Sequence, residues 1–396
     1  MALLYISNGA LYSFDGDSVR ELKSDVLENY IEKLKSSAQR NEWKRSGEGA
    51  KFTGVYDPSD IQTTLQNLVS RIDSAVFSDK TLFFTQTIDA ASGIYSKRKG
   101  EDTGIVQSDG NHIYRDLSLC DDYILVSAFF AGEAHIGILR RDGSDFRILT
   151  EGRCSDRYPK CSTSCKNKIY YQSAGLLVND SEQEQSNAPH PPFMYPMETP
   201  PSLIGPSSIC VLDTDKSEIT ELLSDDKYDY IKPTPDDKGN LYFIRKPYEA
   251  PKTSKLGCLL DIILFPVRLI GALFGFLSVF SLKYSGKSLR QNSPTAAKTP
   301  DEKKIFIDGN LIDAEKAYKE SKRKGDPEPG IIPQSYQLCR LSEDGSISVI
   351  ARGVIAYALS GDDLYYSNGK AIIKLSSDGK SEKVCSADKV TFISIY

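Results

Sequence analysis

The amino-acid sequence predicts an all-β protein that is built from repeated four-stranded units. Two observations lead to this prediction. The stretch 354–396 alternates short apolar runs with turn residues, so we expect it to form four strands followed by the first strand of another unit. The two turns that are most typical of this stretch also recur upstream, which indicates an internal repeat.

The C-terminal unit is the template for the others. Its breaks contain pairs such as Asn368-Gly369 and Asp378-Gly379, which tight hairpin turns favour. The four expected strands are 354–359, 364–366, 371–375 and 382–385.

Both typical turns recur along the chain. The hairpin before an aromatic strand is found at 78–80, 120–122, 164–167, 236–239 and 361–363. The later hairpin, often Asp-Gly, is found at Asp15-Gly16, 99–101, Asp142-Gly143, 213–216, Asp344-Gly345 and Asp378-Gly379.

The two ends of the sequence complete one unit. A sixth aromatic strand, 3–6, lies at the very start, where no first hairpin precedes it. The run 390–396 is then expected to be strand one of the unit whose other strands are 3–6, 10–14 and 18–22. Six four-stranded units joined in this way predict a closed six-bladed β-propeller, which leaves no large open sheet edge.

The pattern resembles the TolB-like six-bladed propellers, which share an Asp-Gly hairpin and a first turn of the type Pro-x-x-Ser-Pro-Asp-Gly. The nearest matches are Lys232-Pro-Thr-Pro-Asp-Asp-Lys-Gly239 and Tyr158-Pro-Lys-Cys-Ser162. The resemblance covers the blades and implies the fold only. Such propellers include protein-binding modules, peptidase gating domains and a few metal-dependent enzymes, so function has to be argued from a site.

Three insertions interrupt the single predicted propeller, 1–396. The insertion 24–71 is expected to be helical, with Asp25 and Glu28 as a capping box and a second helix after Asp57-Pro58. The insertion 179–206 is rich in proline, which predicts an extended or irregular loop that either recognises a partner or lies across the propeller.

The third insertion, 247–335, contains an apolar segment, 256–282, and then a short helix from about 311 to 324. The apolar segment is long enough to cross a bilayer. The chain leaves and re-enters the same blade, however, so a single crossing is excluded. The segment is expected to dip into a membrane surface, bind a protein partner or cover the propeller itself. Its candidate contact residues are Leu264, Phe265, Leu269, Ile270, Leu273, Phe274, Phe276, Leu277 and Phe280.

Charge and cysteine content narrow the classes of function. The net charge of −5 predicts no nucleic-acid partner. The N-terminus has no basic and apolar signal pattern, which predicts a cytoplasmic protein. Cys120 and the other cysteines near strands are expected to be free thiols. Cys154, Cys161 and Cys165 match no zinc spacing and have no histidine nearby in sequence, so we expect no metal and no cofactor.

Candidate site residues lie in the loops that lead into the first strand of each unit, which converge at the mouth of a propeller channel. Charged residues recur there, either as a polar funnel for an anionic or peptide ligand or as turn caps that pair with one another. The candidates are Arg71, Asp73, His112, Arg115, Asp116, Arg153, Asp156, Arg157, Asp226, Tyr228, Asp229 and Arg352.

These features favour a non-enzymatic binding or scaffolding module with a protein or peptide partner. A membrane surface is a further expected partner through 256–282. The sequence contains no Gly-x-Ser-x-Gly, HExxH or phosphate-loop motif. The alternative is a hydrolase or lyase that acts at the channel mouth, with or without a metal ion.

Overall fold

The computed structural model describes residues 2–40, 65, 68–89, 91–162, 164–177, 203–249, 304–307 and 310–396. The chain divides into one unit of residues 1–248 and 305–396, and a second of 249–304. The fold described here is that of the first unit. The predicted second helix of 24–71, nearly all of the proline-rich 179–206 and the apolar segment 256–282 lie outside the described residues.

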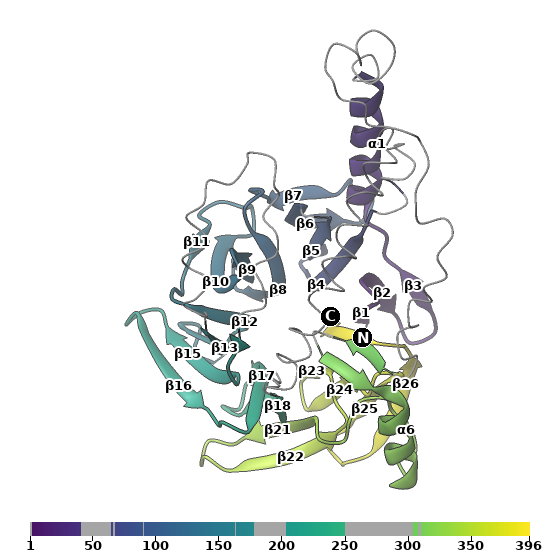
Figure 1. The fold of residues 1–396 in the computed structure, drawn as a ribbon, viewed down its shortest axis with the longest axis vertical. Coiled ribbons are helices and arrows are strands. Elements are labelled where there is room, and N and C mark those ends of the chain that lie inside the picture. The colour runs from purple at the N-terminus through teal and green to yellow at the C-terminus, as the bar shows by residue number, and fades with distance from the viewer. Residues whose placement is uncertain are drawn as a thin grey trace, which may run out of the picture. The chain divides into compact units, whose positions relative to one another are not determined.

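The described chain is predominantly β, as predicted, and its strands form antiparallel sheets (Figure 1). Short alternating runs end at turn residues, so most strands pair with a sequence neighbour through a hairpin. The first sheets comprise β1 (Leu3–Ser7), β2 (Ala10–Phe14) and β3 (Val19–Glu21) with β27 (Val390–Ile395), and then β4 (Ser70–Ser78), β5 (Thr81–Ile88), β6 (Ala91–Arg98) and β7 (Gly104–Gln107).

The middle of the chain forms one nine-stranded sheet, because a single parallel bridge between Ala134 and Ser155 joins a four-stranded part to a five-stranded part. The first part contains β8 (Ile113–Cys120), β9 (Tyr123–Phe130), β10 (Glu133–Arg140) and β11 (Arg147–Ile148). The second contains β12 (Cys154–Cys161), β13 (Lys168–Leu177), β15 (Ser208–Asp213) and β16 (Glu218–Leu223), with β14 (Leu203–Ile204) beside β13.

The remaining two large sheets lie in the second half of the chain. One has the order β17 (Tyr228–Pro235), β18 (Leu241–Pro247), β21 (Gln337–Leu341) and β22 (Ile347–Arg352). The other consists of β23 (Ala356–Ser360), β24 (Asp363–Ser367), β25 (Ala371–Leu375) and β26 (Ser381–Ser386).

The sheets surround a centre, toward which β4, β8, β12, β17 and β23 lie (Figure 1). Neighbouring inner strands contact one another, from β27 to β4, β8, β12 and β17, and from β23 to β27. β27 pairs antiparallel with β1, so that Leu3 faces Ile395 and Ile6 faces Phe392.

Apolar side chains pack between successive sheets. Phe83 and Ile94 of one sheet meet Tyr114, Leu117 and Ile124 of the next in a buried cluster. Comparable clusters join the other sheets, so the core is divided among the interfaces between them. Face-to-face packing of this kind keeps the inner strands at fixed relative positions.

Helix α1 (Asp25–Arg40) confirms the helix expected after residue 24. Its N-terminal contacts differ from the expected capping box: Ser24 Oγ accepts the Val26 N–H at 3.1 Å, whereas Lys97 Nζ binds both carboxylate oxygens of Asp25 at 2.9 Å. Lys97, on β6 of the neighbouring sheet, therefore binds the Asp25 carboxylate that was expected to cap the helix.

The segment before helix α6 contains a hairpin that the sequence pattern did not predict, β19 (Lys304–Ile307) and β20 (Asn310–Asp313). Ile307 and Ile312 are buried in the same cluster as Leu3 and Tyr5, so this hairpin is part of the core. Helix α6 (Ala314–Arg323) begins three residues later than predicted, after an N-cap at Asp313.

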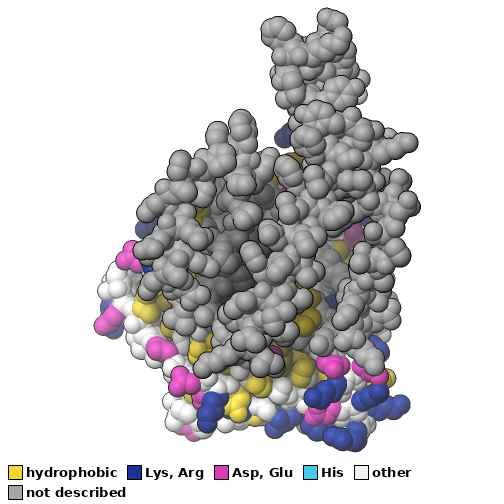
Figure 2. All heavy atoms as spheres, in the orientation of Figure 1, with side chains coloured by type: hydrophobic (Ala, Val, Ile, Leu, Met, Phe, Trp, Pro, Cys, Tyr) yellow, Lys and Arg dark blue, Asp and Glu magenta, His cyan; other side chains and the backbone are white. Residues whose placement is uncertain are grey.

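The surface of α6 carries charges of both signs (Figure 2, lower right). Within the helix, Lys319 pairs with Glu315, and Lys324 just beyond it pairs with Glu320. Such pairs support an exposed helix. Within the described part of the chain, no helix has the length and apolar character needed to cross a membrane.

One expectation about cysteines is wrong. Cys120 and Cys161 form a disulfide rather than remaining free thiols. These residues end β8 and β12, two inner strands that the sequence separates by a whole unit. The bond therefore links neighbouring inner strands at corresponding ends.

Candidate functional site

Four consecutive inner strands share the same kind of irregularity. In each, the register against the second strand of the sheet shifts, which is the mark of a β-bulge. A bulge re-aims side chains that strict alternation would direct elsewhere, and bulges are frequent beside active sites. The shifts lie between Ile72 and Ser74 in β4, Arg115 and Ser118 in β8, Arg157 and Lys160 in β12, and Ile231 and Thr234 in β17.

Three of these bulges contain a non-glycine residue with left-handed backbone. The φ angles of Asp116, Tyr158 and Lys232 are 54°, 55° and 55°. Tyr158 and Lys232 each precede a proline, a position that favours extended backbone, so both are strained. Such residues cost on the order of 1 kcal/mol or more each, and strain that persists in a fold is a reason to examine a site for function.

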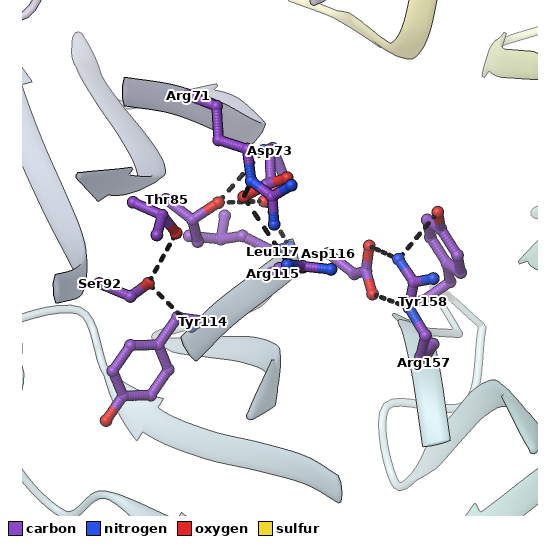
Figure 3. A network of polar contacts seen from close by, with 12 residues as sticks. Arg71, Asp73, Thr85, Ser92, Tyr114, Arg115, Asp116, Leu117, Arg157 and Tyr158 are labelled. Atoms are coloured by element: carbon purple, nitrogen blue, oxygen red, sulfur yellow. Dashed lines mark hydrogen bonds and ion pairs between the residues drawn. The ribbon is translucent and has the colours of Figure 1, made fainter. Parts of the chain in front are cut away.

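Asp116 is the acceptor of a bidentate ion pair that joins β8 to β12 (Figure 3). The Nε and Nη2 atoms of Arg157 lie 2.9 and 3.1 Å from its two carboxylate oxygens. Nη2 also donates to the Tyr158 hydroxyl at 3.1 Å. Asp116 is only 6% exposed, so this pair is largely desolvated and its geometry is well fixed.

A second group of charges joins β4 to β8 (Figure 3). Asp73 Oδ2 lies 3.3 Å from Arg71 Nε and 3.9 Å from Arg115 Nε. The Nε atom of Arg115 is buried and donates no hydrogen bond to any residue that the structure describes. About a quarter of the Arg115 side chain, 27%, is nevertheless exposed, so its guanidinium is within reach of solvent.

An aromatic ring connects the two groups. The guanidinium carbons of Arg115 and Arg157 lie 4.8 and 5.5 Å from the centroid of the Phe129 ring. The ring stabilises both cations through its quadrupole and holds them near each other. The site is therefore a continuous arrangement of charges on β4, β8 and β12.

Lys232 extends this arrangement to the inner strands of the second half of the chain. Its Nζ lies 5.1 Å from the centroid of the Tyr158 ring and donates to the carbonyl oxygens of Ile355 and Thr391, each at 3.0 Å. The Tyr357 hydroxyl donates to the Lys232 carbonyl at 2.6 Å. One side chain thus links β17 to the segment before β23 and to β27.

Buried serine hydroxyls stabilise the bulged strands through hydrogen bonds to neighbouring strands. Ser74 Oγ lies 2.9 Å from Thr85 Oγ1 and accepts the Leu117 N–H at 2.8 Å. Ser92 Oγ similarly accepts the Tyr114 N–H at 3.0 Å. Because these bonds satisfy polar groups that the register shifts expose, the bulges are built into the packing of the sheets.

The electrostatic balance of the arrangement is positive. Burial lowers the pKa of the Lys160 ammonium, and the Asp116 carboxylate opposes that shift. Even with Lys160 neutral, cations outnumber carboxylates, which favours an anionic ligand. We call the following residues the inner-strand network: Arg71, Asp73, Arg115, Asp116, Phe129, Arg157, Tyr158, Lys160 and Lys232.

His112, a predicted candidate, belongs to a separate cluster. Its Nδ1 lies 2.6 Å from Asp109 Oδ2, and its ring packs against Tyr114, Phe130 and Phe146. Burial alone would raise the pKa of Asp109, but the N–H and imidazole of His112, with other donors, hold it well below its usual range.

The other candidates are dispersed. Asp229 binds Lys246 at 3.1 Å and Tyr228 packs under Arg245, so both pair within their own sheet. Asp226 and Arg153 are exposed. Arg352 ends β22, the outermost strand of its sheet, and is exposed there rather than facing the centre. Asp156 is buried beside Cys154.

The structure therefore gathers five of the twelve candidates, Arg71, Asp73, Arg115, Asp116 and Arg157, and adds Phe129, Tyr158, Lys160 and Lys232. In the sequence, Tyr158 and Lys232 stand out only as parts of a turn motif, but they lie within β12 and β17. The available signal was a proline inside an inner strand, because proline in a strand interior marks a bulge.

No protein-family model matches the sequence, and no curated protein matches it. Among solved structures, the chain is similar to a chain of a nidogen–laminin complex, with 10% identity, a TM-score of 0.47 and coverage of 99% of this chain and 97% of that one. It is also similar to TolB from Acinetobacter baumannii, with 9% identity and a TM-score of 0.45, over 99% of this chain and 66% of that chain.

A putative TolB from Agrobacterium tumefaciens is similar at 11% identity with a TM-score of 0.42, over 81% of this chain and 82% of that chain. The chain is thus similar to two TolB proteins over most of its length. At these scores the likeness carries no argument about function, which has to come from the residues of this chain.

Proposed function

We propose that this chain is a closed six-bladed β-propeller that binds a protein or peptide partner through an anionic group. In this proposal the four strands β27, β1, β2 and β3 form the blade that closes the ring, and the segments 24–71, 179–206 and 247–335 are insertions between strands. The pairing of β27 with β1 and the contacts between neighbouring inner strands support this architecture.

The positive inner-strand network supports the choice of an anionic ligand. A guanidinium binds a carboxylate through two parallel N–H donors, and Arg115 has a buried Nε that donates to no described acceptor. Phe129 holds that guanidinium beside Arg157. The arrangement suits the carboxylate of an acidic side chain or of a peptide C-terminus.

The test is the binding of immobilised peptides of equal length, acidic or basic, to the full-length protein. We expect retention on the acidic set, weakening as the salt concentration rises, because the attraction is electrostatic. Arg115→Gln should weaken that binding by about tenfold or more, the value of a charge-assisted hydrogen bond.

The matched control is Arg20→Gln. The Arg20 side chain, on β3, is 73% exposed and pairs with Asp15 in the turn before that strand. This variant should bind acidic peptides as the wild type does. Equal retention of acidic and basic peptides, or equal losses in the two variants, would overturn the proposal.

A further inference from the structure

A second cluster of chemically reactive side chains lies where the two parts of the nine-stranded sheet meet. His135 belongs to β10, whereas Cys154 and Asp156 belong to β12. One ligand atom from each lies within 4.8 Å of the others. The cluster forms because the bridge between Ala134 and Ser155 sets the two strands side by side. Residues 154 and 156 share a face, since side chains alternate along a strand.

We propose that His135, Cys154 and Asp156 bind a divalent cation of the zinc type. Imidazole, thiolate and carboxylate are the three ligand classes of protein zinc sites. In a tetrahedral site, the sulfur and either of the other ligand atoms would be about 3.6 Å apart. The Sγ of Cys154 lies 3.9 Å from His135 Nδ1 and 3.3 Å from Asp156 Oδ2, so small movements complete the geometry.

The Asp156 carboxylate provides an independent reason to place a cation there. Asp156 is only 2% exposed, and its Oδ1 atom has no hydrogen-bond partner in the described chain. A buried polar atom without a partner is destabilising, and more so when the group is charged. A bound cation removes this penalty.

Cys154 would bind the cation as a thiolate, so binding would release the thiol proton to solvent.

A supporting contact orients the histidine. The second ring nitrogen of His135, Nε2, lies 3.4 Å from Glu133 Oε2. Histidine ligands commonly donate their other N–H to a carboxylate, which fixes the tautomer and strengthens the ligand. Nδ1, which faces Cys154, is thereby the nitrogen left to bind the cation.

The experiment uses untagged full-length protein that has been stripped with a chelator under reducing conditions and then titrated with Zn²⁺ or Co²⁺. We expect one ion per chain and, with Co²⁺, the near-ultraviolet charge-transfer band of a thiolate ligand. Cys154→Ser should abolish that band. Asp156→Asn and His135→Ala should each reduce the bound metal well below one equivalent, and Glu133→Gln should weaken binding by about tenfold.

Cys165→Ser is the matched control, because Cys165 is a free and exposed cysteine. It should leave the stoichiometry and the band unchanged, and circular dichroism should show that every variant is folded. Two results would each overturn the proposal: wild-type protein that binds no metal, or Cys154→Ser protein that retains both the metal and the thiolate band.

Discussion

The inner strands β17 and β23 lie on opposite sides of one interface between sheets but differ in regularity. β23 pairs with β24 at five successive positions without a register shift, from Ala356 with Ser367 to Ser360 with Asp363. β17 shifts register at Lys232. The regular strand β23 contributes apolar packing. The bulged strand β17 directs the Lys232 ammonium toward β12, the segment before β23 and β27. Regular pairing here builds the fold, and the bulges place the charges.

Removing β27 should have the largest effect on both strands, since β27 contacts β23 and its Thr391 carbonyl accepts a hydrogen bond from Lys232 of β17. Deletion of residues 390–396 removes Val390 and Ile393, which are 0% and 5% exposed. Their burial alone is worth about 4 kcal/mol, at about 2 kcal/mol for each side chain. Thermal unfolding should show a large decrease in stability. A deletion of residue 396 alone is the control, and equal stability of the 390–396 deletion and full-length protein would contradict the six-bladed architecture.

Lys232→Met tests the bulged region more narrowly. The change retains an unbranched side chain but removes the donor to the Ile355 and Thr391 carbonyls, so we expect a loss of about 3 kcal/mol in urea unfolding. Lys238→Met, at an exposed ion pair with Asp362, should cost less than about 1 kcal/mol. Similar losses in both variants would show that the bulge lysine is no more than a surface cation.

The smallest expected effect compares an ion pair between two bulged strands, β8 and β12, with an ion pair in the regular sheet that contains β23. A double-mutant cycle on Asp116→Asn and Arg157→Gln should give a coupling of about 2 kcal/mol, because the pair is bidentate and largely buried. Asparagine tolerates left-handed backbone, so the bulge itself is preserved. The pair Asp363–Lys374 in the regular sheet should give about 0.5 kcal/mol. A larger coupling in the second pair would reverse the comparison.

The sequence predicts strands well where alternation is unbroken. The expected strands 10–14 and 371–375 coincide with β2 and β25, and the pairing of 390–396 with the N-terminal strand is observed. The hairpin β19–β20 was missed because it is short and its buried side chains, Ile307 and Ile312, pack against strands that are distant in sequence.

The candidate site was predicted less completely, for a physical reason. A bulge adds one residue to a strand and reverses which side chains face the centre, so alternation cannot identify Tyr158 or Lys232. The proximity of His135 to Cys154 was also not predictable, because no short spacing connects them. It depends on the parallel bridge between β10 and β12.

The pairing of β27 with β1 has a consequence for synthesis of the chain. β1 is made early, but the inner strand that pairs with its free edge is made about 390 residues later. At about 5–20 residues per second, that edge waits roughly 20–80 s with unpaired N–H and C=O groups. During this interval the buried side chains of Leu3 and Tyr5 also lack the C-terminal members of their cluster, such as Ile393, so nascent chains should be most prone to aggregate before β27 emerges.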